Sequence, residues 1–195
     1  MLRPRFFFAS VTALVIALGS LARADDMGAF LRESQRFTAM RSFKLQIDTT
    51  TPHGSSSKYL TYGAPNKLRI DVPTQKLAVV VIGTLVWVRG SGGKWSKQKL
   101  APGADPLRAV HDASVIAKQI KGETVTFVRN EQLGTVPTHV YELQPPQKRG
   151  YRAKTTQIWI ATSDGFPRKI VQQNGPFSST ATYTDLNGAL SISGP

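Results

Sequence analysis

Hydrophobic and polar residues alternate with a period of two along most of the chain. In the segment SFKLQIDTTT, which begins at Ser42, every second residue from Phe43 to Ile47 is apolar. This pattern is typical of a strand that buries one face. Similar segments, separated by turn-forming Gly, Pro and Asn, predict about ten short strands. They lie within residues 42–51, 57–63, 68–72, 76–90, 93–100, 123–132, 138–145, 154–163, 168–174 and 178–186, and the range 76–90 holds two strands with a turn at Gly83-Thr84.

Two segments have helical periodicity instead. Residues 26–40 follow Asp25-Asp26, which can cap a helix, and their apolar residues recur every three or four positions. A second helix is predicted from Pro106 to about Ile120, because proline suits a first helical turn and Gly122 suits an end. Its apolar face includes Val110 and Ile116.

Runs of neighbouring strands favour an antiparallel sheet. The predicted fold is mainly β with two or three helices, in which a curved antiparallel sheet forms an incomplete barrel closed by the helices. Such a body has either a filled core or an internal cavity. The pattern leaves both possibilities open.

The amino terminus is predicted to be a secretory signal peptide. Arg3 and Arg5 precede an uncharged apolar run from Phe6 to Gly19, and Ala22-Arg23-Ala24 supplies small residues where a signal peptidase cleaves. A membrane-spanning helix needs about 20 apolar residues, and this run is shorter. We expect residues 1–24 to be removed after export to the periplasm, leaving one domain, 25–195.

The chain is strongly basic, with 25 Lys and Arg against 12 Asp and Glu. In an exported protein this balance favours anionic lipid headgroups or acidic proteins as partners, rather than nucleic acid. The chain has no cysteine and therefore no disulfide. We expect a monomer.

The stretch RGSGGKWSK resembles a phosphate-binding loop at first sight. The Walker pattern needs a glycine five positions before Gly93, where Val88 stands, and Ser or Thr after Lys94, where Trp95 stands. The glycines instead predict a hairpin turn with a basic tip. A second basic cluster, KRGYRAK, is predicted to be a solvated loop or a contact for anionic headgroups. The candidate headgroup or partner contacts are Arg89, Lys94, Lys97, Lys148, Arg149 and Arg152.

The sequence gives little support for catalysis or for a cofactor. His53, His111 and His139 are widely separated, and none lies near a GxSxG nucleophile motif. No HExxH or His-x-His spacing indicates a metal site. We therefore predict a protein that is not an enzyme and has no metal or other cofactor.

Four segments resemble motifs of one family. They are APNKLRIDV, GTLVWVRGSGGKW, QIWIATSDGFPRKI and the closing ATYTDLNGALSISGP. In this order they are similar to motifs of the periplasmic outer-membrane lipoprotein carrier superfamily, the LolA-like proteins. Ala64 stands where the carriers have Arg before Pro-Asn, so the resemblance is to a branch other than the classical carriers.

The resemblance implies an incomplete β-barrel closed by helices, with an apolar cavity that binds acyl chains of lipids or lipoproteins. The first hypothesis is accordingly a periplasmic binding protein, or carrier, for a hydrophobic ligand. The alternative is a regulatory module with a filled core, which docks an acidic partner or a membrane surface through its basic loops. The candidate cavity residues are Phe43, Leu45, Ile47, Leu68, Ile70, Trp87, Val110, Ile116, Ile120, Phe127, Tyr141, Trp159 and Tyr183.

Overall fold

The computed structural model describes residues 23–101, 122–146 and 154–195. Eleven strands form one sheet. The first six are β1 (Ser42–Thr51), β2 (Gly54–Gly63), β3 (Lys67–Val72), β4 (Leu77–Ile82), β5 (Leu85–Arg89) and β6 (Trp95–Lys99). The other five are β7 (Thr124–Leu133), β8 (Val136–Gln144), β9 (Lys154–Ala161), β10 (Pro167–Asn174) and β11 (Phe177–Thr184). The helices are α2 (Arg23–Ser34) and the short 3₁₀ helices η1 (Gln35–Ala39) and η2 (Pro73–Gln75).

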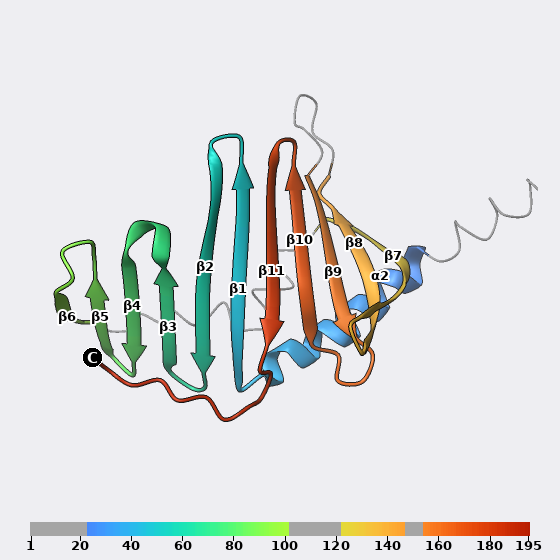
Figure 1. Ribbon diagram of the computed structural model, residues 1–195. Coiled ribbons are helices and arrows are strands. Elements are labelled where there is room, and N and C mark those ends of the chain that lie inside the picture. The colour runs from blue at the N-terminus through green and yellow to red at the C-terminus, as the bar shows by residue number, and fades with distance from the viewer. Residues whose placement is uncertain (1–22, 102–121, 147–153) are drawn as a thin grey trace, which may run out of the picture.

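The sheet is a chain of antiparallel neighbours in the order β6-β5-β4-β3-β2-β1-β11-β10-β9-β8-β7. It is not closed, so β6 and β7 form its two ends (Figure 1). The strands β1 and β11 are far apart in the sequence but pair directly, with Leu45 opposite Tyr183. This pairing joins a meander built from β1–β6 to a second meander built from β7–β11.

The strand register divides the side chains into two faces. Directly paired residues point to the same face of a sheet, and neighbours along a strand point to opposite faces. The helix α2 lies on one face, behind β7–β11 in Figure 1. We call this the helix face, and the side turned toward the viewer the outer face.

The core lies between the helix face and the segment α2–η1. Phe30 of α2 contacts Tyr141 edge-on at 5.4 Å between ring centroids. Phe37 and Met40 are buried in the same cluster, together with Phe43. The apolar positions of α2 therefore determine which side of the helix meets the sheet.

The carboxy-terminal segment, residues 185–195, lies against the outer face. Ser42 Oγ donates a hydrogen bond to the Gly188 carbonyl at 2.6 Å, and Asn187 N donates to the Ser42 carbonyl at 2.8 Å. Further along the segment, the side chain of Ile192 is buried, with only 6% of its surface exposed. Figure 1 shows the segment passing the ends of β1–β4 toward β5. The segment thus covers apolar side chains on a face that the helices do not reach.

The predicted strands agree closely with the observed ones, and the count is eleven rather than about ten. The predicted helix at 26–40 is also present, but it begins at Arg23 and its last turns, from Gln35, are 3₁₀. The described residues contain one α-helix and two short 3₁₀ helices. The second predicted helix, and most of the predicted signal peptide, lie outside the described residues.

Candidate ligand-binding face

The helix face of β1–β5 carries a buried row of side chains that crosses the strands. Phe43 is paired with Tyr62, Tyr62 with Leu68, and Leu68 with Val81. All four residues are at most 6% exposed. The rings of Phe43 and Tyr62 lie 5.2 Å apart. This row belongs to the hydrophobic core.

A second apolar row lies next to the buried row, two residues further along each strand. Cross-strand pairing joins its members in one line, from β11 through β1 to β5. All of them are half-buried. In strand order they are Tyr183, Leu45, Leu60, Ile70, Val79 and Val88. We call this line the half-buried row.

The half-buried row is long and without charge. Six strands at about 4.8 Å spacing give it a length of about 24 Å. This exceeds the roughly 15 Å of hydrocarbon in one leaflet of a bilayer. No described helix lies behind β2–β6, whereas α2 lies behind β7–β11 (Figure 1). The row is therefore an apolar strip with the dimensions of an extended acyl chain.

Tyr183 brings a hydroxyl group to one end of this row. Its ring lies 5.5 Å from the ring of Phe43. Burial raises the pKa of Tyr183 to about 12, since the phenolate would lose its hydration here. The same burial leaves this end of the row weakly hydrated.

The structure brings together some of the predicted cavity residues and separates others. Leu45, Ile70 and Tyr183 lie in the half-buried row. Phe43 and Leu68 lie in the buried row beside it. Three further predicted residues share this face, one near the centre and two near the β7 end of the sheet. Ile47 is half-buried beyond Leu45, while Tyr141 is buried and Phe127 is 37% exposed beside α2.

The prediction that Trp87 and Trp159 line the same side as these residues is wrong. Trp87 pairs with Val80, which pairs with Arg69, and this register places all three on the outer face. Trp159 pairs with Lys169 on the outer face of β9 and β10. Both tryptophans stand in runs of consecutive apolar residues, 85–88 in β5 and 158–161 in β9, where alternation does not indicate a face. Val110, Ile116 and Ile120 lie outside the described residues.

Three members of the half-buried row were missed. Leu60 stands in SKYLTYG, where Leu60 and Tyr62 alternate with Tyr59 and Thr61, so alternation could have identified it. Val79 and Val88 stand in continuous apolar runs, and only their pairing partners reveal the face. The basic candidates Arg89, Lys94 and Lys97 lie in and around the β5–β6 hairpin. Lys148, Arg149 and Arg152 lie outside the described residues.

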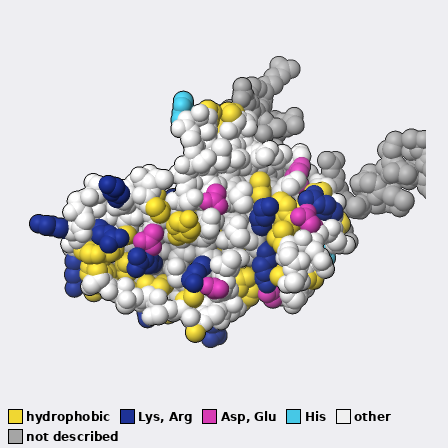
Figure 2. Space-filling view, in the orientation of Figure 1, with side chains coloured by type: hydrophobic (Ala, Val, Ile, Leu, Met, Phe, Trp, Pro, Cys, Tyr) yellow, Lys and Arg dark blue, Asp and Glu magenta, His cyan; other side chains and the backbone are white. Residues whose placement is uncertain are grey.

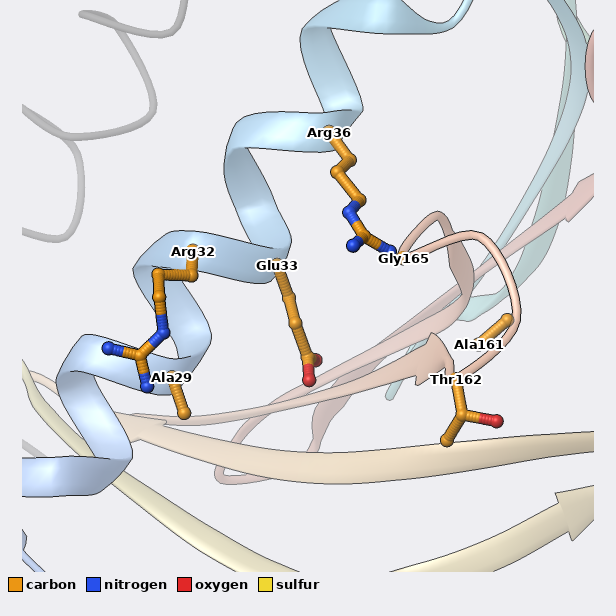
Figure 3. A pocket seen from close by; sticks show the side chains of 7 residues that line it. All are labelled: Ala29, Arg32, Glu33, Arg36, Ala161, Thr162 and Gly165. Carbon is orange, nitrogen blue, oxygen red and sulfur yellow. The ribbon is translucent and has the colours of Figure 1, made fainter.

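A polar pocket lies where α2 meets the loop after β9. Its volume is about 330 Å³, and Figure 3 shows Arg36 reaching toward Gly165 of that loop while Glu33 points toward the strands. The lining residues are Ala29, Arg32, Glu33, Arg36, Ala161, Thr162 and Gly165. Gly165 has φ +72°, and a β-carbon there would lie 2.5 Å from Arg36 Cδ. The positive φ favours glycine at this position, and a larger residue would also require the Arg36 side chain to move.

The same region contains an acid–histidine contact. His139 Nδ1 of β8 lies 2.9 Å from Glu33 Oε1. Burial, with the nearby Glu33 carboxylate as a further cause, raises the pKa of Tyr141 to about 12. These contacts join α2 to β8, and they lie at the opposite end of the helix face from β5.

Two searches of the described residues give negative results. Within residues 23–101, 122–146 and 154–195, no group of three or more His, Asp or Glu side chains is arranged to hold a metal ion. In the same part of the chain, no helix has the length and apolar character needed to cross a membrane.

Comparison with known proteins gives matches among solved structures alone. No protein-family model matches the chain. No curated protein sequence matches it either. The lipoprotein LppX of Mycobacterium tuberculosis matches with a TM-score of 0.54 and 14% identity, over 85% of this chain and 99% of that chain. LprF of Mycobacterium bovis matches with a TM-score of 0.60 and 13% identity, over 86% of this chain and 95% of that chain.

The chain has the LolA-like fold. A LolA superfamily protein of Nitrosomonas europaea aligns more weakly, with a TM-score of 0.36 and 11% identity over 85% of this chain and 94% of that chain. Of the fold that the four sequence motifs implied, the mainly β character and the open antiparallel sheet are confirmed, with one α-helix rather than two or three among the described residues. At these identities the likeness concerns the fold alone.

Proposed function

We propose that the protein is an exported binding protein for the acyl chain of a lipid or lipoprotein. The observation that carries this proposal is the half-buried row, an uncharged apolar strip that crosses six strands on the helix face. Isolated apolar side chains on a surface are ordinary, whereas a continuous strip of this length is typical of a binding surface.

The affinity would come from burial of hydrocarbon. Each methylene group transferred from water contributes about 0.8 kcal/mol. A long chain lying along Leu45, Leu60, Ile70 and Val79 would therefore bind without any charged contact. The Tyr183 hydroxyl at the β11 end is the polar group placed to meet an ester or amide next to the chain.

Two sequence features support an exported location. The apolar run from Phe6 to Gly19, followed by Ala22-Arg23-Ala24, is the pattern of a secretory signal peptide. Carriage of a hydrocarbon chain through the periplasm would require such a location. The proposed function is binding and transfer as a monomer, with no chemical step.

Native mass spectrometry, followed by solvent extraction, tests the proposal on protein purified from its own compartment. We expect a stoichiometric lipid or lipopeptide. Leu60→Glu places a charge in the half-buried row, and the matched control Thr61→Glu places the same charge on the outer face of the same strand. We expect Leu60→Glu to lose the copurifying lipid and Thr61→Glu to keep it.

Circular dichroism of both variants separates loss of binding from loss of folding. A protein that carries no lipid, and that takes up no fluorescent fatty acid when folded, would contradict the proposal. Equal uptake by folded Leu60→Glu and Thr61→Glu would show that the ligand lies elsewhere.

A further inference from the structure

The outer face of β3–β6 combines apolar and basic side chains in three cross-strand rows. The central row runs from Arg69 through Val80 and Trp87 to Lys97. The flanking rows add three basic residues and a second tryptophan. They are Asp71, Ala78, Arg89 and Trp95 on one side, and Lys67, Ile82, Leu85 and Lys99 on the other.

The β5–β6 hairpin contributes half of this surface, and we call its outer-face residues the basic–aromatic patch. They are Leu85, Trp87, Arg89, Trp95, Lys97 and Lys99. Arg89 Cζ lies 4.9 Å from the centroid of the Trp95 ring, and Lys97 Nζ lies 5.6 Å from that of Trp87. Both distances are typical of cation–π contacts. The cations are thus held over the aromatic rings rather than extended away from them.

The charge around the patch has one sign. Residues 72–101 contain five basic residues and no Asp or Glu. The single carboxylate in the three rows, Asp71, accepts hydrogen bonds from Arg69 at 2.7 and 3.1 Å. Figure 2 shows this side of the outer face, with basic side chains around a hydrophobic area on the left. Arg89, Lys97 and Lys99 have no acidic side chain opposite them in these rows.

Edge protection explains part of this arrangement but not all of it. Lysine in an edge strand discourages pairing with a second molecule, and β6 is at one end of the sheet. Edge protection needs charge of either sign and does not need tryptophan. It does not account for two indole rings on the same face, nor for the absence of acids.

We propose that the basic–aromatic patch docks the protein on an anionic lipid bilayer. Tryptophan favours the headgroup level of a bilayer, and clustered Lys and Arg favour anionic headgroups. The patch is one side of a sheet, and the tip Gly90-Ser91-Gly92-Gly93 has little side-chain bulk, so a planar surface can approach Arg89 and Trp95 next to the tip, whereas Gly194 of the carboxy-terminal segment lies beside Trp87. This inference goes beyond the proposed function and stands without it.

The strand β5 links the patch to the helix face. Trp87 and Arg89 point to the outer face, whereas Val86 and Val88 on the same strand point to the helix face. Val88 is the last member of the half-buried row. A bilayer held by the patch would therefore lie at one end of the apolar strip.

Vesicle co-sedimentation tests the docking. The probes are vesicles of phosphatidylcholine alone and of phosphatidylcholine mixed with phosphatidylglycerol. The double variant Lys97→Glu/Lys99→Glu keeps β6 charged, so edge protection is retained while the sign is reversed. The control Lys58→Glu/Lys154→Glu makes the same change in net charge at two exposed lysines on other strands. Every variant has the same amino terminus as the parent, so any contribution of the apolar run at residues 6–19 to vesicle binding is the same in all of them.

We expect the parent to bind the mixed vesicles, and to bind them less at high salt. Reversal at Lys97 and Lys99 should weaken this binding at least about tenfold, and the control should change it much less. Lys94→Glu, in the turn outside the strands, gives a second reversal in case the double variant does not fold. Trp95→Ser should weaken binding while leaving its salt dependence in place.

Three results would overturn the docking proposal. One is equal binding of the parent to neutral and anionic vesicles. Another is equal loss in the Lys97→Glu/Lys99→Glu variant and its control. The third is binding of polyglutamate that depends on Lys97 and Lys99 without any binding of vesicles, which would assign the patch to an acidic protein. The lipid content found by extraction is measured separately, so failure of docking is distinguishable from failure of the proposed function.

Discussion

Glu33 and His139 are 106 residues apart in the sequence, and their side chains meet at 2.9 Å between Oε1 and Nδ1. The contact joins α2 to β8 at the side of the sheet where the helix lies. It is half-buried, with the His139 side chain 34% and the Glu33 side chain 24% exposed. Together with the hydrogen bond from Phe127 N to Asp26 Oδ2 at 2.9 Å, this contact positions α2 on the sheet alongside its apolar packing.

We predict that His139→Phe lowers the free energy of unfolding by about 1–2 kcal/mol. The substitution leaves the Glu33 carboxylate without this hydrogen bond in a half-buried site. Urea denaturation followed by circular dichroism measures the change. His53→Phe, at an exposed turn, is the matched control and should be close to neutral. Equal stability of the two variants would show that the contact does not hold α2.

The second prediction concerns alkaline pH. The Tyr183 pKa is raised from 10.0 to about 12 in the folded protein, because burial disfavours the phenolate. A raised pKa contributes stability that is present in full below pH 10 and is lost as the pH rises toward about 12, since only the unfolded chain deprotonates there. Tyr183→Phe should therefore reduce the loss of stability in this range by about 2 kcal/mol.

Tyr141 also has a raised pKa, so Tyr183→Phe should reduce the alkaline loss without abolishing it. Unfolding by urea at a series of pH values between 9 and 12 measures the effect. Tyr59→Phe, at a tyrosine that is 43% exposed, is the control and should leave the alkaline loss as in the parent. An unchanged pH profile for Tyr183→Phe would mean that Tyr183 is hydrated.

The third prediction concerns the carboxy-terminal segment. A β-carbon on Gly194 would lie 3.5 Å from the Trp87 ring, and Ile192 is buried nearby against Gly63. Ile192→Asp should release the segment, because an unpaired carboxylate is unfavourable in that site. We expect Trp87 to become more accessible to acrylamide, measured with Trp95→Phe and Trp159→Phe in the background. Ser193→Asp, at an exposed neighbour, should leave quenching unchanged.

The fourth prediction concerns removal of the ligand. A ligand that binds the folded chain alone stabilises it, by about 2.7 kcal/mol at a concentration one hundred times Kd. Extraction of the copurified lipid should accordingly lower the Tm, and addition of the extracted lipid should restore it. Thr61→Glu should respond as the parent does, and Leu60→Glu should have the same Tm before and after extraction. A Tm independent of lipid in the parent would contradict specific binding.

The strands were predictable from the sequence because most of them carry one clean signal. In β1, the alternation from Phe43 to Ile47 indicates both the strand and its buried face, and the structure confirms both. The turns were equally clear, since Gly83, Gly134 and Gly175 have positive φ at the ends of hairpins. Local rules were sufficient wherever the chain turns back on its neighbour.

The faces of β4, β5 and β9 were not predictable, and the site prediction was weakest there. In LVWVR, every residue before Arg89 is apolar, so alternation cannot assign Trp87 to a side. The register with Val80 assigns it, and this register depends on a pairing between strands. The contacts of Arg89 with Trp95 and of Lys97 with Trp87 likewise require the hairpin register. Sequence reasoning identified the basic residues and Trp87, but not the contacts between the cations and the aromatic rings.

The unclosed sheet has a consequence for the range of ligands. In a closed barrel, the number of strands and their stagger determine the internal width. Here β6 and β7 are not bonded to each other, so the distance between these edges can change while all ten inter-strand ladders stay intact. A small change of twist at each ladder adds up across the sheet. Under the proposed function, such bending would let the sheet accommodate chains of different thickness while every ladder hydrogen bond stays in place.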